Sequence, residues 1–242
     1  MIDNSSKKDN PFDDLDLHSF SITERRLFFA LISLFKEGAK EVHLDLSDIR
    51  SLGIYADKYP KAKMLIKAMD NFSRHAYSLI FHDVKHSKGL LFIRNISLFK
   101  EIAYEVNDDR KFYPDHFQAF IKIHPKAVPL VKKMGEFMSF ELEEYQKLTS
   151  SYSQKLFIAM QPFKSKGVYK VSQEDLKKLL DVPEKYRQSD IDRKILKRTV
   201  EELNASFPNL EYSKEKNEPD KRRVTGYVFT FKKSRSRKKS RP

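Results

Sequence analysis

Residues 189–212 include four basic side chains within six positions, Arg193, Lys194, Lys197 and Arg198. Such side chains neutralise DNA phosphates and donate hydrogen bonds to base edges in the major groove. At about 100° per residue they share one side of a helix. The opposite side carries Ile195, Leu196, Thr199, Val200 and Leu203. The pattern predicts a helix that packs through one face and contacts nucleic acid through the other, with a merely solvated charged face as the alternative.

The start of this helix has its own signal. Ser189 followed three residues later by Asp192 predicts an N-cap at Ser189. Asp190 and Asp192 then lie near the positive end of the helix dipole.

The charge balance of the whole chain favours a polyanionic partner. The formal net charge of the 242 residues is +13, and the last eleven, KKSRSRKKSRP, hold seven cations and no acid. Removing those seven from +13 still leaves +6. A basic body of this kind points to nucleic acid more than to a small-molecule substrate.

Motifs for chemistry are absent from the sequence. None of the six glycines belongs to a G-x-x-x-x-G-K loop, and the lack of cysteine excludes disulfides and thiolate zinc sites. The DxD spacings at Asp14 and Asp190 are better explained by a tail and a helix cap than by metal binding, and His82 and His86 flank a predicted turn. We therefore predict no enzymatic activity, no cofactor and no metal.

The sequence also contains no membrane-spanning or secretory signal. No uncharged apolar run reaches the roughly 18 residues of a membrane helix, and residues 1–17 lack the apolar stretch of a secretory signal. We expect a cytoplasmic protein with no membrane partner.

The element order is that of a winged helix. A capping box at Ser21 and Glu24 opens a helix to about Gly38, and residues 42–54 suggest an extended piece and a short helix capped at Ser47. A third helix over 61–77 and a hairpin over 78–99 that turns at residues 87–89 follow. The hairpin is the expected wing.

This order occurs twice. Four pairs of segments resemble one another in the same sequence: 26–32 and 155–161, 44–54 and 171–182, 69–81 and 200–212, and 89–99 and 223–231. Repetition at this length indicates two copies of one domain. The predicted fold class is α+β, with two tandem winged-helix domains related by an internal pseudo-repeat.

Domain boundaries follow from composition. We expect a disordered tail over 1–17, domain 1 over 18–124, an ordered linker over 125–148, domain 2 over 149–231 and a disordered basic tail over 232–242.

The third helix of domain 1 has the same polarity as the helix after 189. Its cations are Lys63, Lys67 and Arg74. Leu65, Met69, Phe72 and Ala76 occupy the opposite face. Two helices at equivalent places, each with basic and apolar faces opposed, strengthen the prediction of DNA contact.

Specific motifs in the second half resemble those of initiator Rep proteins of theta-replicating, iteron-bearing plasmids, of the RepB and RepE type. The motifs are Ser151-Tyr152-Ser153, Leu179-Leu180-Asp181-Val182, Lys185-Tyr186 and Glu202-Leu203-Asn204. A weaker resemblance covers residues 20–137.

This resemblance implies two winged-helix domains that bind directly repeated origin sequences, about 20 bp each, as a monomer and promote origin opening. A homodimer built mainly through the first domain, in equilibrium with the monomer, would repress the protein's own gene, and host replication proteins are further expected partners. The basic residues of 193–198 would read the major groove in the second domain. The wing contacts would be Lys216, Lys221, Arg222 and Arg223. The resemblance also implies a bacterial protein associated with nucleoid or plasmid.

Two alternatives stay open from the sequence. A winged-helix transcription regulator without a replication role would use the same fold. RNA binding through the basic tail is a third hypothesis, although the aromatic and glycine signatures of common RNA modules are missing.

Overall fold

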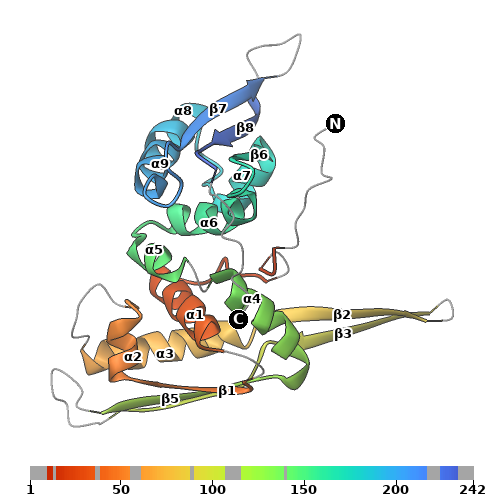
Figure 1. Cartoon of the computed structure of the whole chain (residues 1–242), viewed down its shortest axis with the longest axis vertical. Helices are drawn as coiled ribbons and strands as arrows, with labels where there is room; N and C mark the ends of the chain where they lie inside the picture. The colour runs from red at the N-terminus through yellow and green to blue at the C-terminus, as the bar shows by residue number, and fades with distance from the viewer. Residues whose placement is uncertain are drawn as a thin grey trace, which may run out of the picture. The chain divides into compact units, whose positions relative to one another are not determined.

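The computed structural model describes residues 10–12, 15–35, 39–54, 61–87, 90–106, 116–138, 141–216 and 224–233. The chain forms two compact units. The first unit spans Asp9–Lys147 and the second begins at Leu148 (Figure 1). The second unit thus begins within one residue of the boundary expected at 149.

Three helices form the centre of the first unit. They are α1 (Ile22–Leu34), α2 (Leu46–Ser51) and α3 (Ala62–Ala76). The predicted capping box at Ser21 is present: the Ser21 backbone N–H donates to Glu24 at 2.6 Å, and the Glu24 N–H donates to the Ser21 hydroxyl. The helix ends at Leu34, earlier than expected.

The predicted cap of the second helix at Ser47 is wrong. Asp45 is the N-cap of α2, because its carboxylate accepts the backbone N–H groups of Ser47 and Asp48 at 2.7 and 3.0 Å. Ser47 already lies in the first turn and donates its hydroxyl to the same carboxylate. These hydrogen bonds hold the pKa of Asp45 below its usual value, with the Ser47 hydroxyl as the largest cause.

Two separate sheets belong to the first unit. Strands β1 (Glu41–Asp45), β5 (Phe117–Ile123) and β4 (Phe99–Val106) pair antiparallel in the order β1-β5-β4. Strands β2 (Ile80–Ser87) and β3 (Leu90–Ser97) form a two-stranded ribbon, as the hairpin signal predicts. Figure 1 shows this ribbon projecting from the helices of the unit.

Aromatic side chains fill the core of the first unit. Phe28, Phe72 and Phe99 are almost fully buried, and their rings meet edge to face. Phe12 joins them, with its ring centroid 5.1 Å from that of Phe29. Phe12 and Leu15 are both buried, although we assigned them to a disordered tail. Two buried apolar side chains three residues apart anchor this short segment on α1.

The predicted linker over 125–148 packs as part of the first unit. It contains η1 (Pro125–Ala127), α4 (Val128–Met138) and α5 (Leu142–Lys147). Gly135 allows α4 to approach α1 closely, because a Cβ there would lie 3.1 Å from the carbonyl oxygen of Ile32. From α5 the Gln146 amide donates to the Arg26 carbonyl on α1 at 3.0 Å.

The second unit repeats the scheme without the ribbon. Its first half contains α6 (Ser151–Met160), η2 (Gln161–Phe163), β6 (Val168–Ser172) and α7 (Gln173–Leu180). Next come α8 (Gln188–Asp190), the π-helical η3 (Ile191–Leu196) and α9 (Lys197–Leu203). Strands β7 (Glu211–Lys216) and β8 (Val224–Thr230) complete a sheet of order β6-β8-β7.

Sheet order corrects one part of the predicted repeat. In each sheet the last strand of the unit, β5 or β8, lies between the strand before the second helix, β1 or β6, and the strand that precedes it along the chain, β4 or β7. The counterpart of β7 and β8 is therefore β4 and β5. The match of 89–99 to 223–231, and with it the hairpin over 78–99 as the wing, is wrong. The β2–β3 ribbon is an addition to the first unit.

Candidate nucleic-acid interface

Residues 188–203 form one continuous helical segment from α8 through η3 to α9, called here the basic helix. It begins at Gln188 with Arg187 as the N-cap, so the predicted cap at Ser189 is wrong. The Asp190 carboxylate accepts the Arg187 N–H at 3.2 Å, which places the first turn two residues earlier.

The two faces of the basic helix are opposed as predicted. Ile191, Ile195, Leu196 and Leu203 are at most 1% exposed. The exposed residues of the same segment include Arg193, Lys194, Lys197 and Arg198. The helix is thus fixed through its apolar face and offers all four cations to solvent.

Two of these cations share one acidic neighbour. Arg193 Nη2 and Lys194 Nζ lie 3.6 and 3.0 Å from Asp190 Oδ1. The hydrogen bond from Lys194 is the main reason why the pKa of Asp190 lies below its usual value. Exposed pairs of this kind contribute little to stability, so a phosphate can replace Asp190 at little cost. With the described carboxylates, Lys197 and Arg198 form no ion pair within 4 Å.

Side chains from three other elements hold the start of the basic helix. Lys194 Nζ lies 4.8 Å from the ring centroid of Tyr186, a cation–π contact. The Gln188 amide donates to the Tyr227 hydroxyl on β8 and accepts from Gln173 on α7 at 2.6 Å. Burial raises the pKa of Tyr227 to about 12. Sequence reasoning missed these contacts because residues 173, 186 and 227 are far apart along the chain.

The end of the basic helix is held through Glu202. Its carboxylate accepts the backbone N–H and the hydroxyl of Thr149 at 2.5 and 2.8 Å. Burial raises the pKa of Glu202, but the nearby Ser153 hydroxyl and the hydrogen bonds from Thr149 outweigh this and leave it below its usual value. Asn204 Oδ1 accepts the Leu210 N–H at 3.1 Å and shapes the return to β7. The motifs at 151–153 and 202–204 therefore position the helix.

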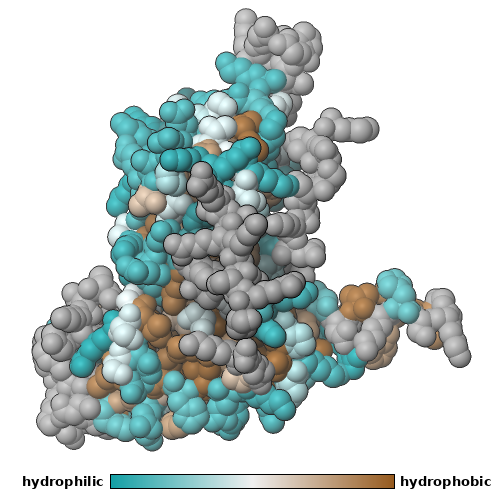
Figure 2. All heavy atoms as spheres, in the orientation of Figure 1, coloured by the Kyte–Doolittle hydropathy of each residue, from teal (hydrophilic) through white to brown (hydrophobic). Residues whose placement is uncertain are grey.

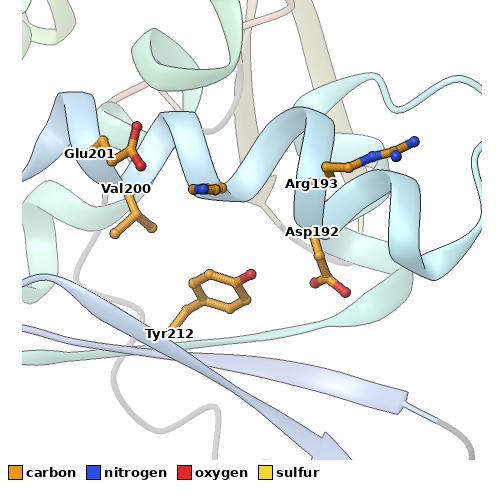
Figure 3. A pocket seen from close by; sticks show the side chains of 6 residues that line it. Asp192, Arg193, Val200, Glu201 and Tyr212 are labelled. Atoms are coloured by element: carbon orange, nitrogen blue, oxygen red, sulfur yellow. The ribbon is translucent and has the colours of Figure 1, made fainter.

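A groove of about 400 Å³ separates the basic helix from β7. In Figure 3 Asp192, Val200 and Tyr212 face one another across it, whereas Arg193 points away. Asp192 also pairs with Lys214 on β7 and so ties the helix to the first strand of the wing. The lining residues are Asp192, Arg193, Lys197, Val200, Glu201 and Tyr212.

The first unit presents a second basic helix face on α3. Lys63, Lys67 and Arg74 are exposed. As predicted, the opposite face is buried by Leu65, Met69, Phe72 and Ala76. Among the cations lies Asp70, which accepts the hydroxyl of Tyr104 on β4. Burial is the main cause that raises the pKa of Tyr104 to about 12. In both units a carboxylate on this helix thus contacts the first strand of the wing.

The predicted wing contacts are described only in part. Lys216 ends β7 and is exposed. The remaining three, Lys221, Arg222 and Arg223, lie outside the described residues.

His82 and His86 are exposed on β2, and His82 contacts Asn95 at 2.7 Å. Among the described residues, no group of three His, Asp or Glu side chains could hold a metal ion. None of the described helices is long and apolar enough to span a bilayer.

Comparisons with known proteins give the family. The model described as Initiator Replication protein, WH1, matches residues 6–161. The model described as Initiator Rep protein, WH2, matches residues 172–231. The probable replication protein rep of Bifidobacterium longum (strain NCC 2705) is 34% identical over 99 residues, which are 40% of this chain and 32% of that protein. The chain thus matches about a third of the length of this curated relative.

Solved structures of low identity share the fold. The crystal structure of the Pi initiator protein in complex with iteron DNA has a TM-score of 0.60 at 13% identity, covering 87% of this chain and 90% of that chain. A structure of domains 2 and 3 of RctB has a TM-score of 0.57 at 14% identity, covering 88% and 82%. The predicted pair of winged-helix domains and the predicted family are both confirmed. The chain belongs to the initiator replication protein family.

Proposed function

We propose that this protein initiates plasmid replication by binding direct repeats, or iterons, at an origin. The observation that carries the proposal is the row of four exposed cations on the basic helix, opposite a buried face, in a chain of the initiator family. The Pi initiator protein, which shares the fold, is bound to iteron DNA in its crystal structure. The two basic helix faces, one in each unit, would enter successive major grooves.

The proposed mechanism is binding and deformation without covalent chemistry. Cations on the basic helix and on α3 neutralise phosphates and donate to base edges. A bent duplex meets more of the protein surface, and the additional interactions offset the cost of bending it and of unstacking an adjacent A·T-rich segment. Origin opening would follow from this deformation, without an enzymatic activity or a cofactor.

Footprinting on the DNA that flanks the gene tests the proposal. The full chain should protect direct repeats of about 20 bp beside an A·T-rich stretch, and permanganate should detect unpaired thymines in that stretch. Replacing Arg193, Lys194, Lys197 and Arg198 together with alanine should abolish the protection. Protection of one palindrome alone would instead indicate a transcription regulator without a replication role.

A homodimer that represses the gene of this protein is the second part of the proposal. The β2–β3 ribbon supports it, because its large apolar side chains lie in water on both faces of the ribbon. Leu90, Leu91, Phe92 and Ile93 are 74%, 56%, 53% and 54% exposed. Figure 2 shows hydrophobic surface on this ribbon. Neither outer edge of the ribbon pairs with another described strand.

A second copy of the ribbon fits this surface. An isolated two-stranded hairpin is marginally stable in water, and an unpaired edge is a template for a further strand. Pairing two ribbons would satisfy the edge hydrogen bonds and bury the leucines together. The monomer would then bind the repeats at the origin, while the dimer occupies the promoter.

The proposal also includes docking of host replication proteins and a location in the bacterial cytoplasm. An initiator that opens DNA must pass the single strands to a helicase-loading system, so we infer docking of host proteins on the bound monomer. Coprecipitation of plasmid DNA with the protein from a cleared bacterial lysate would support this location.

A further inference from the structure

A second cluster of cations lies on the second unit, away from the four of the basic helix. It is made by Lys164, Lys166, Lys232 and Lys233 and is called here the lysine corner. Lys166, Lys232 and Lys233 are exposed and Lys164 is half-buried. These residues come from two segments, the loop after η2 and the end of β8, that are 65 or more positions apart in sequence.

Backbone hydrogen bonds hold the two segments together. The Phe231 N–H donates to the Gly167 carbonyl at 3.0 Å, and the Lys232 N–H donates to the Pro208 carbonyl at 2.7 Å. Gly167 has a φ of 74°, and a Cβ there would lie 2.7 Å from Lys233 Cγ. The aliphatic part of Lys233 therefore lies directly against the loop that carries Lys166.

Aromatic rings set the positions of the other two ammonium groups. Lys164 Nζ lies 5.4 Å from the ring centroid of Phe207, and Lys166 Nζ lies 5.6 Å from that of Phe163. Phe207 is fully buried and follows directly on the basic helix, because its N–H donates to the Leu203 carbonyl at 2.9 Å. The lysine corner is thus built on rigid structure at the C-terminal end of the basic helix.

Acidic residues are scarce in the segments that form this corner. In the segments 161–170, 204–211 and 229–233 the sequence has one acidic residue, Glu211, against five lysines. The fifth, Lys170, already pairs with Glu215 at 3.1 Å. Among the described residues, no carboxylate lies within 4 Å of Lys166, Lys232 or Lys233. Repulsion between these ammonium groups raises the free energy of the unbound protein, and a bound polyanion offsets this repulsion.

We propose that the lysine corner binds the phosphate backbone of duplex DNA next to the segment that the basic helix reads. The inference rests on the proposed function, since it assumes that the basic helix lies against DNA. Ammonium groups without base-edge geometry attract phosphates regardless of sequence. The chain continues beyond the corner with Arg235, Arg237, Lys238, Lys239 and Arg241, which extends the same charge in sequence.

The test is the salt dependence of binding by the full chain with Lys164, Lys166, Lys232 and Lys233 changed to glutamine. The probe is a 40-bp duplex of random sequence. For each phosphate that the variant leaves unneutralised, the slope of log Kobs against log salt should become shallower by about 0.9, so a change of about 2 to 4 is expected. Affinity at low salt should fall by about tenfold or more. The preference for footprinted repeats over random DNA should stay within about twofold.

A matched control removes the same charge elsewhere. Lys132 and Lys133 on α4 and Lys177 and Lys178 on α7 are exposed, and their change to glutamine should leave the slope within about one unit. The proposal would be overturned if the corner variant and wild type had equal slopes on the DNA duplex. It would also be overturned if the variant lost affinity only for a 40-bp RNA duplex of the same sequence. Absence of protected repeats for wild type would overturn the proposed function but not this result. Circular dichroism of each variant checks that it is folded.

Discussion

Asp190 divides the four cations of the basic helix into two classes before any DNA is bound. Arg193 and Lys194 both lie within 3.6 Å of its carboxylate, whereas Lys197 and Arg198 pair with no described acid. DNA must displace Asp190 to use the first two. The same carboxylate also accepts the Arg187 N–H and so helps to start the helix.

A double-mutant cycle measures this competition. Because Asp190→Asn keeps an oxygen for the Arg187 N–H but removes the charge, Arg193→Ala should lower the affinity for DNA more in that background than in wild type, by about twofold to fivefold. Titration of a labelled repeat duplex gives the four affinities. Arg198→Ala should cost the same, about 1 to 3 kcal/mol, in both backgrounds. A coupling of the same size for Arg198 would contradict the division into two classes.

Ionisation of Tyr227 should lower the stability of the second unit at alkaline pH. Burial raises its folded pKa to about 12, while an unfolded tyrosine titrates near 10. The unfolded state therefore loses its proton first, and stability should fall as pH rises from about 10 to about 12. The urea midpoint of Tyr227→Phe should fall less steeply over this window than that of wild type. Parallel curves would show that the phenol is not protected in the folded state.

The β2–β3 ribbon is the element that the fold of the first unit needs least. It is a separate sheet, and at its base the Leu98 N–H donates to the Leu79 carbonyl at 2.8 Å. Phe81 and Ile96 are paired across the two strands. A two-residue turn can therefore close the chain at this point.

Replacing residues 82–95 with Asn-Gly tests the role of the ribbon. Because Ile96 and the core below it are kept, we expect a folded protein whose melting temperature changes by only a few degrees. The variant should be a monomer by sedimentation at concentrations where wild type is a dimer, and it should still bind repeat DNA. A variant that remains dimeric would exclude the ribbon as the interface.

Elements were predictable where the signal is local. Capping residues, helical periodicity and the turn at 87–89 gave α1, α3 and the ribbon from sequence. The wing of the first unit was assigned to the wrong hairpin because strand order depends on pairing between distant segments: Val42 on β1 pairs with Ile121 on β5. Alternation along 120–123 is visible in the sequence, but it does not show which strand lies beside this one.

The site was predictable to the same extent. The positions of the four cations and their exposure followed from the helical periodicity of the sequence, because basic and apolar residues recur on opposite faces of the predicted helix. The contacts that hold the helix did not follow from the sequence, because Gln188, Glu202 and Lys214 contact residues 39, 53 and 22 positions away. The lysine corner joins residues 164–166 to 232–233, which only the sheet pairing of β6 with β8 brings together.

At the scale of the molecule, each unit has its own core and its own basic helix face. Phe28 and Phe72 fill the first core, and Phe157 and Phe229 the second. Because the boundary lies at Leu148, a fragment of residues 148–242 should unfold cooperatively.

This fragment should also protect only part of the repeat. Footprints of the fragment and the full chain on the same DNA give the comparison, with the Arg198→Ala fragment as control. If the fragment protects the whole repeat, the first unit does not read DNA. If it fails to fold, the two units are not independent.

The π-helical turn of η3 has a consequence for how the family can vary. The Lys197 N–H bonds to the carbonyl of Asp192, five residues back, so this turn holds one residue more than an α-turn. Deleting a residue inside an ordinary helix rotates every later side chain by about 100°. Here a deletion can be absorbed by conversion to an α-turn, so Lys197, Arg198 and the buried Leu203 would keep their faces while the residues at 193 and 194 change. A deletion at this turn can thus alter the sequence that is read without unfolding the protein.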